Sequence, residues 1–113
     1  MDQAGRVWVA DNGNARLQVF DENGVFLAQV AVPGLREEAF SEPYLAALPG
    51  GVVAASVPLA GEIRLFRPDG TLVTTLPLSS GERQVRPTGL ALLPDGRTLA
   101  VADVGNGVFT VPF

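Results

Sequence analysis

The sequence of 113 residues contains no histidine, no cysteine and no lysine, and all eight of its basic residues are arginine. Without histidine or cysteine, the 113 residues cannot provide a zinc finger, a histidine or cysteine ligand to haem, a disulfide framework, a cysteine–histidine dyad or a serine–histidine–aspartate triad. The polar chemistry that remains rests mainly on oxygen. We therefore expect no catalytic residue, no metal site and no cofactor in this chain.

Charge is also scarce, at 18% of the residues, and the net charge is −4 with a pI near 4.6. The eight arginines are scattered and form no stripe that would neutralise a run of phosphates, so no nucleic-acid partner is expected. No stretch approaches the roughly 20 apolar residues of a membrane span. The first residues also lack the basic and apolar regions of a signal peptide.

Hydrophobic residues are plentiful at 47% of the chain, and 13 glycines and 9 prolines accompany them. The apolar content excludes a disordered tail. The glycine and proline content is high for a helical protein and favours short strands joined by tight turns. The composition thus predicts an all-β fold with almost no helix.

An internal repeat organises the sequence. The segment 5–11, GRVWVAD, recurs at 96–103 as GRTLAVAD, and the segment 17–24, LQVFDENG, recurs at 63–70 as IRLFRPDG. Gly24 and Gly70 are 46 residues apart, and Asp11 and Asp103 are separated by twice that distance. A period of roughly 40 to 50 residues is typical of the four-stranded blades of a β-propeller.

Alternation of apolar and polar residues and turn signals such as Asn-Gly predict ten strands. They group into a first blade at 1–37 without its first strand, a second at 40–78, and a third at 86–113 without its last strand. The expected strands are 6–10, 16–20, 25–30, 44–48, 52–56, 62–66, 71–76, 88–93, 98–102 and 107–111. The fold class is therefore a fragment of a β-propeller built from four-stranded antiparallel meanders.

Residues 5–24 resemble an NHL repeat, in which an apolar strand ends in Val-Ala-Asp, a turn carries Gly-Asn, and Arg-Leu-x-Val-Phe leads to a closing glycine. The second unit keeps this frame but has Val57, Ala60 and Glu62 at the Asp11, Asn14 and Arg16 positions, and the third has Val108 at the arginine position. The resemblance implies a β-propeller, commonly six-bladed, used for binding and as a scaffold. The repeat-motif residues are Asp11, Gly13, Asn14, Arg16, Phe20, Gly24, Phe66, Gly70, Asp103 and Asn106.

We expect these motif residues to be structural. Asp11 and Asn14 are predicted to brace a turn, because their side chains readily bond to nearby backbone groups and the spacing is not that of an EF-hand. Arg16 is expected to pair with Asp11 or with carbonyl groups of a neighbouring blade. Trp8 and Phe20 are expected to pack between blades.

An enzymatic alternative rests on residues 86–103, which are similar to a segment of the calcium-dependent gluconolactonase and regucalcin-like propellers. In that family an asparagine supplies an oxygen to the metal, and here Thr88 replaces it. The peptidyl-hydroxyglycine lyases with NHL repeats depend on histidines, which this chain lacks. A non-catalytic module that recognises a protein, peptide or glycan through its loops is therefore the leading hypothesis, with the lactonase-like hydrolase as the alternative.

The missing strands predict that the chain is part of a larger propeller and that the remaining blades are its partners. The apolar end faces are expected to associate into mixed oligomers rather than a defined dimer. The residues expected to be exposed there are Val7, Val9, Leu17, Leu99, Val101 and Phe109. The chain also resembles propellers appended to bacterial multi-pass membrane proteins, which implies an extracytoplasmic domain as one alternative for its location.

Overall fold

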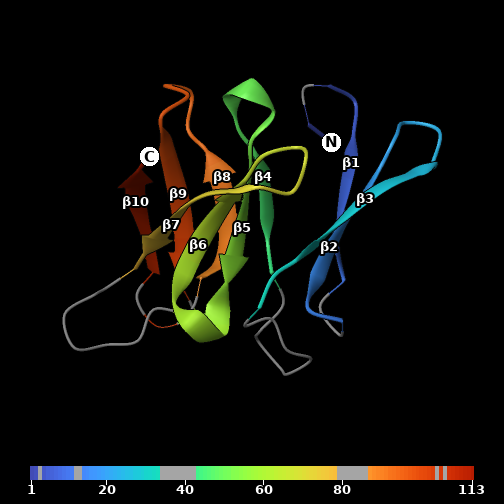
Figure 1. Cartoon of the computed structure of the whole chain (residues 1–113). Helices are drawn as coiled ribbons and strands as arrows, with labels where there is room; N and C mark the ends of the chain where they lie inside the picture. Colours follow the sequence, from blue (N-terminus) through green and yellow to red (C-terminus); the bar gives the residue numbers. More distant parts are fainter. Residues whose placement is uncertain (3, 12–13, 34–42, 79–86, 104, 106) are drawn as a thin grey trace.

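A computed structural model describes residues 1–2, 4–11, 14–33, 43–78, 87–103, 105 and 107–113, and it contains ten strands in three antiparallel sheets (Figure 1). The first sheet consists of β1 (Val7–Asp11), β2 (Arg16–Phe20) and β3 (Phe26–Ala31). The second consists of β4 (Leu45–Ala47), β5 (Val53–Val57), β6 (Glu62–Phe66) and β7 (Leu72–Pro77). The third consists of β8 (Pro87–Leu92), β9 (Thr98–Asp103) and β10 (Gly107–Pro112).

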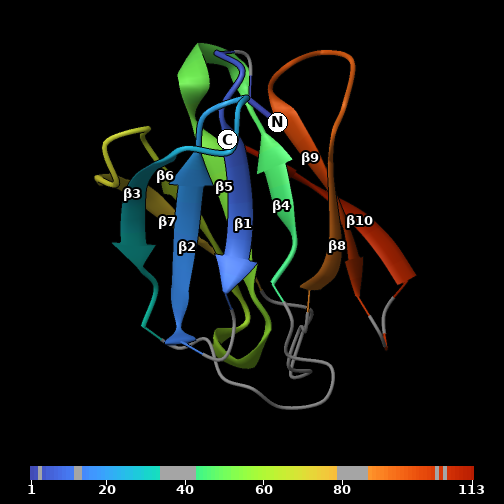
Figure 2. The same ribbon diagram turned by 90° about the vertical axis from the view of Figure 1, so that its right-hand side faces the viewer.

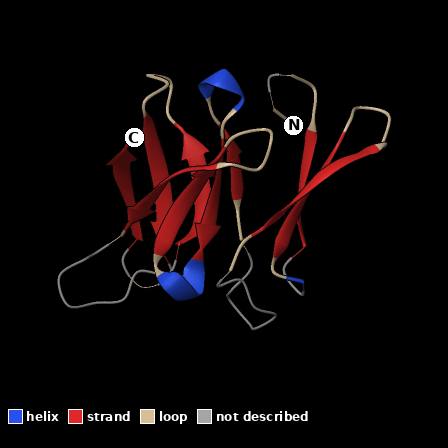
Figure 3. Cartoon of the chain, viewed as in Figure 1, coloured by secondary structure: helices blue, strands red, loops and turns tan. Residues whose placement is uncertain are grey.

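Within each sheet every strand pairs with the strands next to it in sequence, so every sheet is a simple meander. The first strands of the sheets, β1, β4 and β8, lie in a row, with the later strands of each sheet farther out (Figure 2). The described helical segments are the short 3₁₀ turns Pro49–Gly51 and Pro58–Ala60 (Figure 3). The all-β meander architecture expected from the sequence is confirmed.

Glycine turns reproduce the sequence repeat in three dimensions. Gly24, between β2 and β3, and Gly70, between β6 and β7, have φ angles of 85° and 91°. Their N–H groups donate to the carbonyl oxygens of Asp21 and Arg67, at 3.0 and 2.9 Å. Glycine adopts positive φ without the steric penalty of a Cβ atom, so it suits both turns.

One hydrophobic cluster joins the first sheet to the second. Its buried members come from β2, β5 and β6, and from β3 and the residue that follows it; they are Leu17, Val30, Val32, Ala55, Val57 and Phe66. Trp8 and Ala10 of β1 pack against this cluster. The expectation that Trp8 packs between blades is therefore confirmed.

A second cluster joins the second sheet to the third through Leu48, Ala54, Ile63, Leu65, Leu99 and Val101. Leu17, Leu99 and Val101 are fully buried, so the prediction that they form exposed end faces is wrong, and Phe109 also packs against the second cluster. The predicted alternation of sides along the strands was correct, but Leu17, Leu99 and Val101 lie on the side that faces the second sheet. The alternating residues Val9 and Val108 face outward instead and are 43% and 72% exposed.

The strand register corrects two further assignments. Phe20 lies opposite Val7, on the side of the first sheet that faces away from the second, so it does not pack between the described sheets. Asp103 lies opposite Gly107, as Asp11 lies opposite Arg16, so Gly107 rather than Val108 occupies the arginine position. The blade boundaries at 37–40 and 78–86 include residues outside the described ones and stay predictions.

Candidate binding site

A polar network occupies one end of the outward face of the first sheet. Asp11 closes β1 and lies directly opposite Arg16, the first residue of β2. Its Oδ2 accepts a hydrogen bond of 2.8 Å from Arg16 Nε and one of 3.1 Å from Gln18 Nε2. Asn14 Nδ2 donates to both oxygens of the Asp11 carboxylate, each at 3.1 Å. The expected pairing of Arg16 with Asp11 is thus confirmed.

The same network extends to β3, where Gln29 Oε1 accepts a bond of 2.8 Å from Arg16 Nη1. Hydrogen bonds from Arg16 and Asn14 hold the pKa of Asp11 below its ordinary value, so this carboxylate is ionised at neutral pH and cannot serve as a general acid. Beside the network lies an open hollow of about 480 Å³, lined by Asn14, Ala15, Arg16, Gln29 and Ala31.

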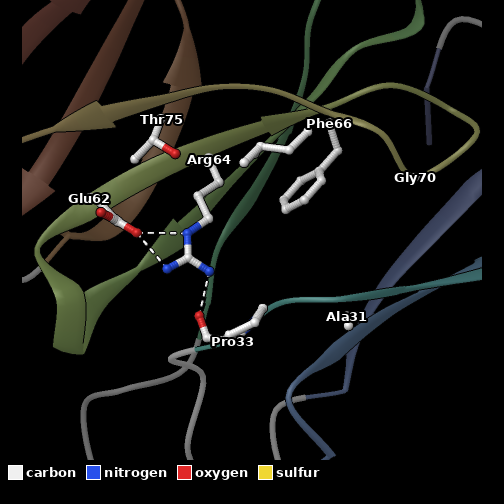
Figure 4. A pocket seen from close by; sticks show the side chains of 8 residues that line it. Ala31, Pro33, Glu62, Arg64, Phe66, Gly70 and Thr75 are labelled. Carbon is white, nitrogen blue, oxygen red and sulfur yellow. Dashed lines mark hydrogen bonds and ion pairs between the residues drawn. The ribbon is translucent and has the colours of Figure 1, made fainter.

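A groove of about 420 Å³ lies between the first and second sheets (Figure 4). It is bordered by the end of β3 and the following residues on one side and by β6, β7 and their turn on the other. Its lining residues are Ala31, Pro33, Glu62, Arg64, Phe66, Gly70, Leu72 and Thr75. The groove has an apolar part around Phe66 and Leu72 and a polar part around Glu62, Arg64 and Thr75.

Two close approaches between the sheets flank this groove. At one, Arg64 bonds to Glu62 through Nε at 2.6 Å and donates from Nη1 to the carbonyl oxygen of Pro33. At the other, a Cβ atom added to Gly70 would lie 3.1 Å from Cγ2 of Val30. Figure 4 places Phe66 between Arg64 and Gly70. The groove thus lies between a polar bridge and a close packing contact.

The remaining motif residues are dispersed. Phe20 makes an edge-to-face contact with Phe26, with ring centroids 5.9 Å apart. Phe66 is buried beside the groove, whereas Asp103 is buried at the end of β9 in the third sheet. Gly13 and Asn106 lie outside the described residues. The structure therefore brings Asp11, Asn14 and Arg16 together but leaves the other described motif residues as separate packing and turn positions.

Asp2 is a buried polar residue that sequence reasoning missed. Its Oδ1 accepts from the backbone N–H groups of Ala4 and Arg6, and its Oδ2 accepts from Arg6 Nε at 2.7 Å and Trp8 Nε1 at 2.9 Å. A signal was present, because Gly5-Arg6 repeats Gly96-Arg97 and thus marks the turn that Asp2 begins.

Other described carboxylates also brace turns. Asp95 accepts from the backbone N–H groups of Arg97 and Thr98 and from the Thr98 hydroxyl, and Asp69 accepts from Thr71 N–H. Across the described part of the chain, no three or more acidic residues gather into a group that would hold a metal ion. Thr88, which we expect at the position of the lactonase asparagine, lies with its hydroxyl 3.5 Å from the Ala102 carbonyl oxygen.

Comparison with known proteins connects this geometry to a family. Residues 1–20 match the family model of the NHL repeat. A 23-residue stretch is 70% identical to the human NHL repeat-containing protein 3, covering 20% of this chain and 7% of that protein. Residues 1–20 are thus an NHL repeat, and the chain folds as part of a β-propeller.

Solved structures show the propeller fold for this chain. It superposes on the dihydro-heme d1 dehydrogenase NirN with a TM-score of 0.73 at 21% identity, covering 96% of the fragment and 23% of that chain. A streptogramin B lyase gives a TM-score of 0.68 at 16% identity, covering 99% and 38%. These likenesses show the propeller fold, which by itself does not assign an activity.

The chain thus spans well under half of the length of each of these proteins. Of its described helical segments, none is long and apolar enough to cross a membrane.

Proposed function

We propose that this NHL-repeat propeller fragment is a non-catalytic binding module whose inter-sheet groove takes an extended segment of a protein or peptide. The observation that carries the proposal is the groove of Figure 4, in which apolar and polar lining groups lie beside two outer strands. An extended peptide presents side chains and backbone groups together, and such a groove has partners for both.

The outer strands supply the backbone part of this recognition. Within the described sheets, β3 pairs only with β2 and β7 pairs only with β6, so each has one edge without a strand beside it. Unpaired edges attract a further strand through backbone hydrogen bonds. An extended segment in the groove is therefore within reach of these edges.

The lining residues indicate what the segment would contain. Leu72 is 48% exposed and lies on the groove beside the buried ring of Phe66, so an apolar side chain gains by covering it. Glu62 and Arg64 neutralise each other at a distance of 2.5 Å. We therefore propose a segment with apolar and uncharged polar residues rather than a highly charged one.

The acidic groups support binding over catalysis. Hydrogen bonds to Asp11, Asp69 and Asp95 hold the pKa of each below its ordinary value, whereas a general acid near neutral pH needs a raised pKa. The Thr88 hydroxyl is a weaker ligand for a hard cation than the asparagine carbonyl of the lactonase-like propellers. These features favour the binding module over the hydrolase alternative.

We also propose that sheets of the same kind lie against the outward faces of the first and third sheets, as the remaining blades of a propeller. The support comes from the second sheet, which is covered on one face by the first sheet and on the other by the third. This arrangement covers apolar groups that are otherwise exposed.

Groove binding is tested with a panel of fluorescein-labelled peptides of about ten residues, long enough to extend along a strand, with alternating apolar and threonine positions. Fluorescence anisotropy is measured with the native chain, with Leu72→Arg, and with Val73→Arg as a matched control. Val73 neighbours Leu72 on β7 and is similarly exposed, but it does not line the groove. We expect Leu72→Arg to weaken binding about tenfold or more while Val73→Arg retains it.

Binding that both variants weaken equally, or no binding by any peptide, would contradict the proposal. Oligosaccharides in the same assay distinguish the glycan alternative, because a glycan-specific module would bind them and not the peptides. Calcium-dependent hydrolysis of a lactone by the native chain would establish the enzymatic alternative instead.

A further inference from the structure

The two ends of the molecule present different sheet faces (Figure 1). Paired residues on adjacent strands project to the same side of a sheet, so the register identifies each face. We define the head face as the outward side of the first sheet, formed by Val7, Val9, Asp11, Arg16, Gln18 and Phe20. We define the tail face as the outward side of the third sheet, formed by Gly89, Ala91, Ala100, Ala102, Val108 and Thr110.

The tail face repeats a face that is covered within the chain. Counting back along the strands from the equivalent residues Val57 and Asp103, Ala100 stands at the position of Ala54 and Ala102 at that of Ser56. Ala54 and Ser56 are both fully buried, and Ala54 packs in the cluster shared with the third sheet. The tail face therefore has the form of a surface that receives another sheet.

The head face repeats the opposite, equally covered side of the second sheet. The pairs Asp11–Arg16 and Val57–Glu62 are equivalent, so Phe20 corresponds to Phe66 and Val9 to Ala55. Phe66 and Ala55 are 3% and 0% exposed because the first sheet covers them. On the head face, the equivalent Val9 is 43% exposed.

The two faces also differ in the size of their side chains. The small residues of the tail face line an apolar hollow of about 270 Å³, formed by Gly89, Leu90, Ala91, Ala100, Ala102 and Val108. The head face projects larger side chains, including Val9 and Phe20. The head face carries no net charge, because Asp11 pairs with Arg16, and the residues of the tail face are uncharged. Burying apolar surface of this kind is favourable by roughly 25 cal/mol for each Å².

We propose that the head face of one copy of this chain packs against the tail face of a second copy. The contact continues the sheet-on-sheet packing that joins the three sheets within the chain, so one molecule carries both halves of the interface. Because the two faces differ, the contact is heterologous and extends to a ring or an open chain of copies. This proposal rests on the proposed function, in which further sheets cover the outward faces of the first and third sheets. Here a second copy of the chain supplies the neighbouring sheet. The proposal does not depend on peptide binding in the groove.

Complementation between two blocked variants tests the proposal. Val9→Arg places an unpaired guanidinium on the head face and Val108→Arg places one on the tail face, which is expected to weaken association roughly a hundredfold. Thr74→Arg adds the same group to β7, at an exposed position that belongs to neither face. Size-exclusion chromatography with light scattering is run at several concentrations on the native chain, on each variant and on mixtures, with circular dichroism to confirm folding.

We expect the native chain and Thr74→Arg to associate as concentration rises, and Val9→Arg and Val108→Arg each to remain monomeric. A mixture of the two blocked variants should form a dimer and nothing larger, because one intact head and one intact tail remain. A native chain that is monomeric at every concentration would overturn the proposal. So would a mixture that fails to dimerise, or association that neither substitution weakens. Ala100→Leu, which fills the hollow without adding charge, should also weaken association. Neither result of this association experiment changes what is expected for peptide binding in the groove.

Discussion

The indole Nε1 of Trp8 donates a hydrogen bond of 2.9 Å to Oδ2 of Asp2, and this bond ties the turn before β1 to the first hydrophobic cluster. Asp2 occupies the turn position held by Leu48 before β5 and by Leu93 before β9: in all three turns the backbone N–H of this residue donates to a carbonyl oxygen four or five residues later. The first sheet therefore uses a polar anchor at this position where the other two sheets use leucine.

Asp2→Ala is expected to lower the free energy of unfolding by about 2 to 4 kcal/mol. The substitution leaves the Arg6 and Trp8 donors without their partner, and charge-assisted hydrogen bonds to a buried carboxylate are among the stronger ones. Urea unfolding followed by Trp8 fluorescence measures the change. Glu22→Ala, at an exposed turn residue, is the control and should shift stability by less than about 0.5 kcal/mol. Equal effects of the two substitutions would contradict the anchoring role.

Arg64→Met is expected to destabilise the chain by roughly 1 to 2 kcal/mol, because it removes the donor to Pro33 and leaves Glu62 without its cation. Methionine keeps most of the apolar stem, so the loss reports the guanidinium group. Arg64→Lys should recover only part of the stability, since an ammonium group cannot bridge both partners with the same fork geometry. Thermal unfolding of the three chains provides the measurement, and full recovery with lysine would argue against the bridge.

Gly70→Ala and Gly24→Ala form a matched pair across the repeat. Both glycines have positive φ, so each substitution costs about 1 kcal/mol of backbone strain. A Cβ atom at Gly70 would also meet Val30 Cγ2 at 3.1 Å, whereas one at Gly24 would meet no atom within 4 Å. Gly70→Ala should therefore be the more destabilising in urea titrations. In a Val30→Ala background, Gly70→Ala and Gly24→Ala should destabilise the chain equally if the close contact causes the difference.

Acid is expected to destabilise the folded chain as the pH falls below the ordinary aspartate pKa of 3.8. Burial raises the pKa of Asp2, but hydrogen bonds from Trp8, Arg6 and Ala4 outweigh it and hold that pKa below the ordinary value of 3.8. Hydrogen bonds likewise lower the pKa values of Asp11, Asp69 and Asp95. As pH falls the unfolded state binds protons first, so the stabilisation present above pH 3.8 is lost as pH falls through the lowered folded values.

Melting temperatures measured across this pH range test the linkage. Asp95→Asn keeps a side-chain oxygen for the turn but removes the titrating group, so it should flatten the pH dependence by lowering the melting temperature at pH 7 while changing it little in acid. A pH profile that is unchanged by this substitution would show that Asp95 does not contribute.

Calcium at millimolar concentration is expected to leave the melting temperature unchanged relative to magnesium at the same ionic strength. A cation that binds only the folded chain would raise it. The carboxylates of Asp11 and Asp95 are already bonded to internal donors, and Thr88 stands where we expect the lactonase asparagine. A rise specific to calcium would favour the hydrolase alternative.

The fold and part of the site were predictable because they depend on local signals. The 46-residue repeat with turn glycines such as Gly24 and Gly70 predicted the meander sheets, since positive φ and a fixed spacing are encoded by a few residues. The Asp11–Arg16 pair was predictable because these residues flank one hairpin turn. Gln29 joined the network only through the register of β3 with β2, which depends on pairing between separate strands.

Alternation along a strand determined by itself which residues share a side, as in Leu17 and Val19 or Leu99 and Val101, because side chains point to opposite faces with a period of two. It did not determine which side meets a neighbouring sheet. The tertiary structure decided that Leu17, Leu99 and Val101 face the second sheet and that Val9 and Val108 face outward. Both sides of these strands carry apolar residues, so only the packing of one sheet on the next distinguishes them.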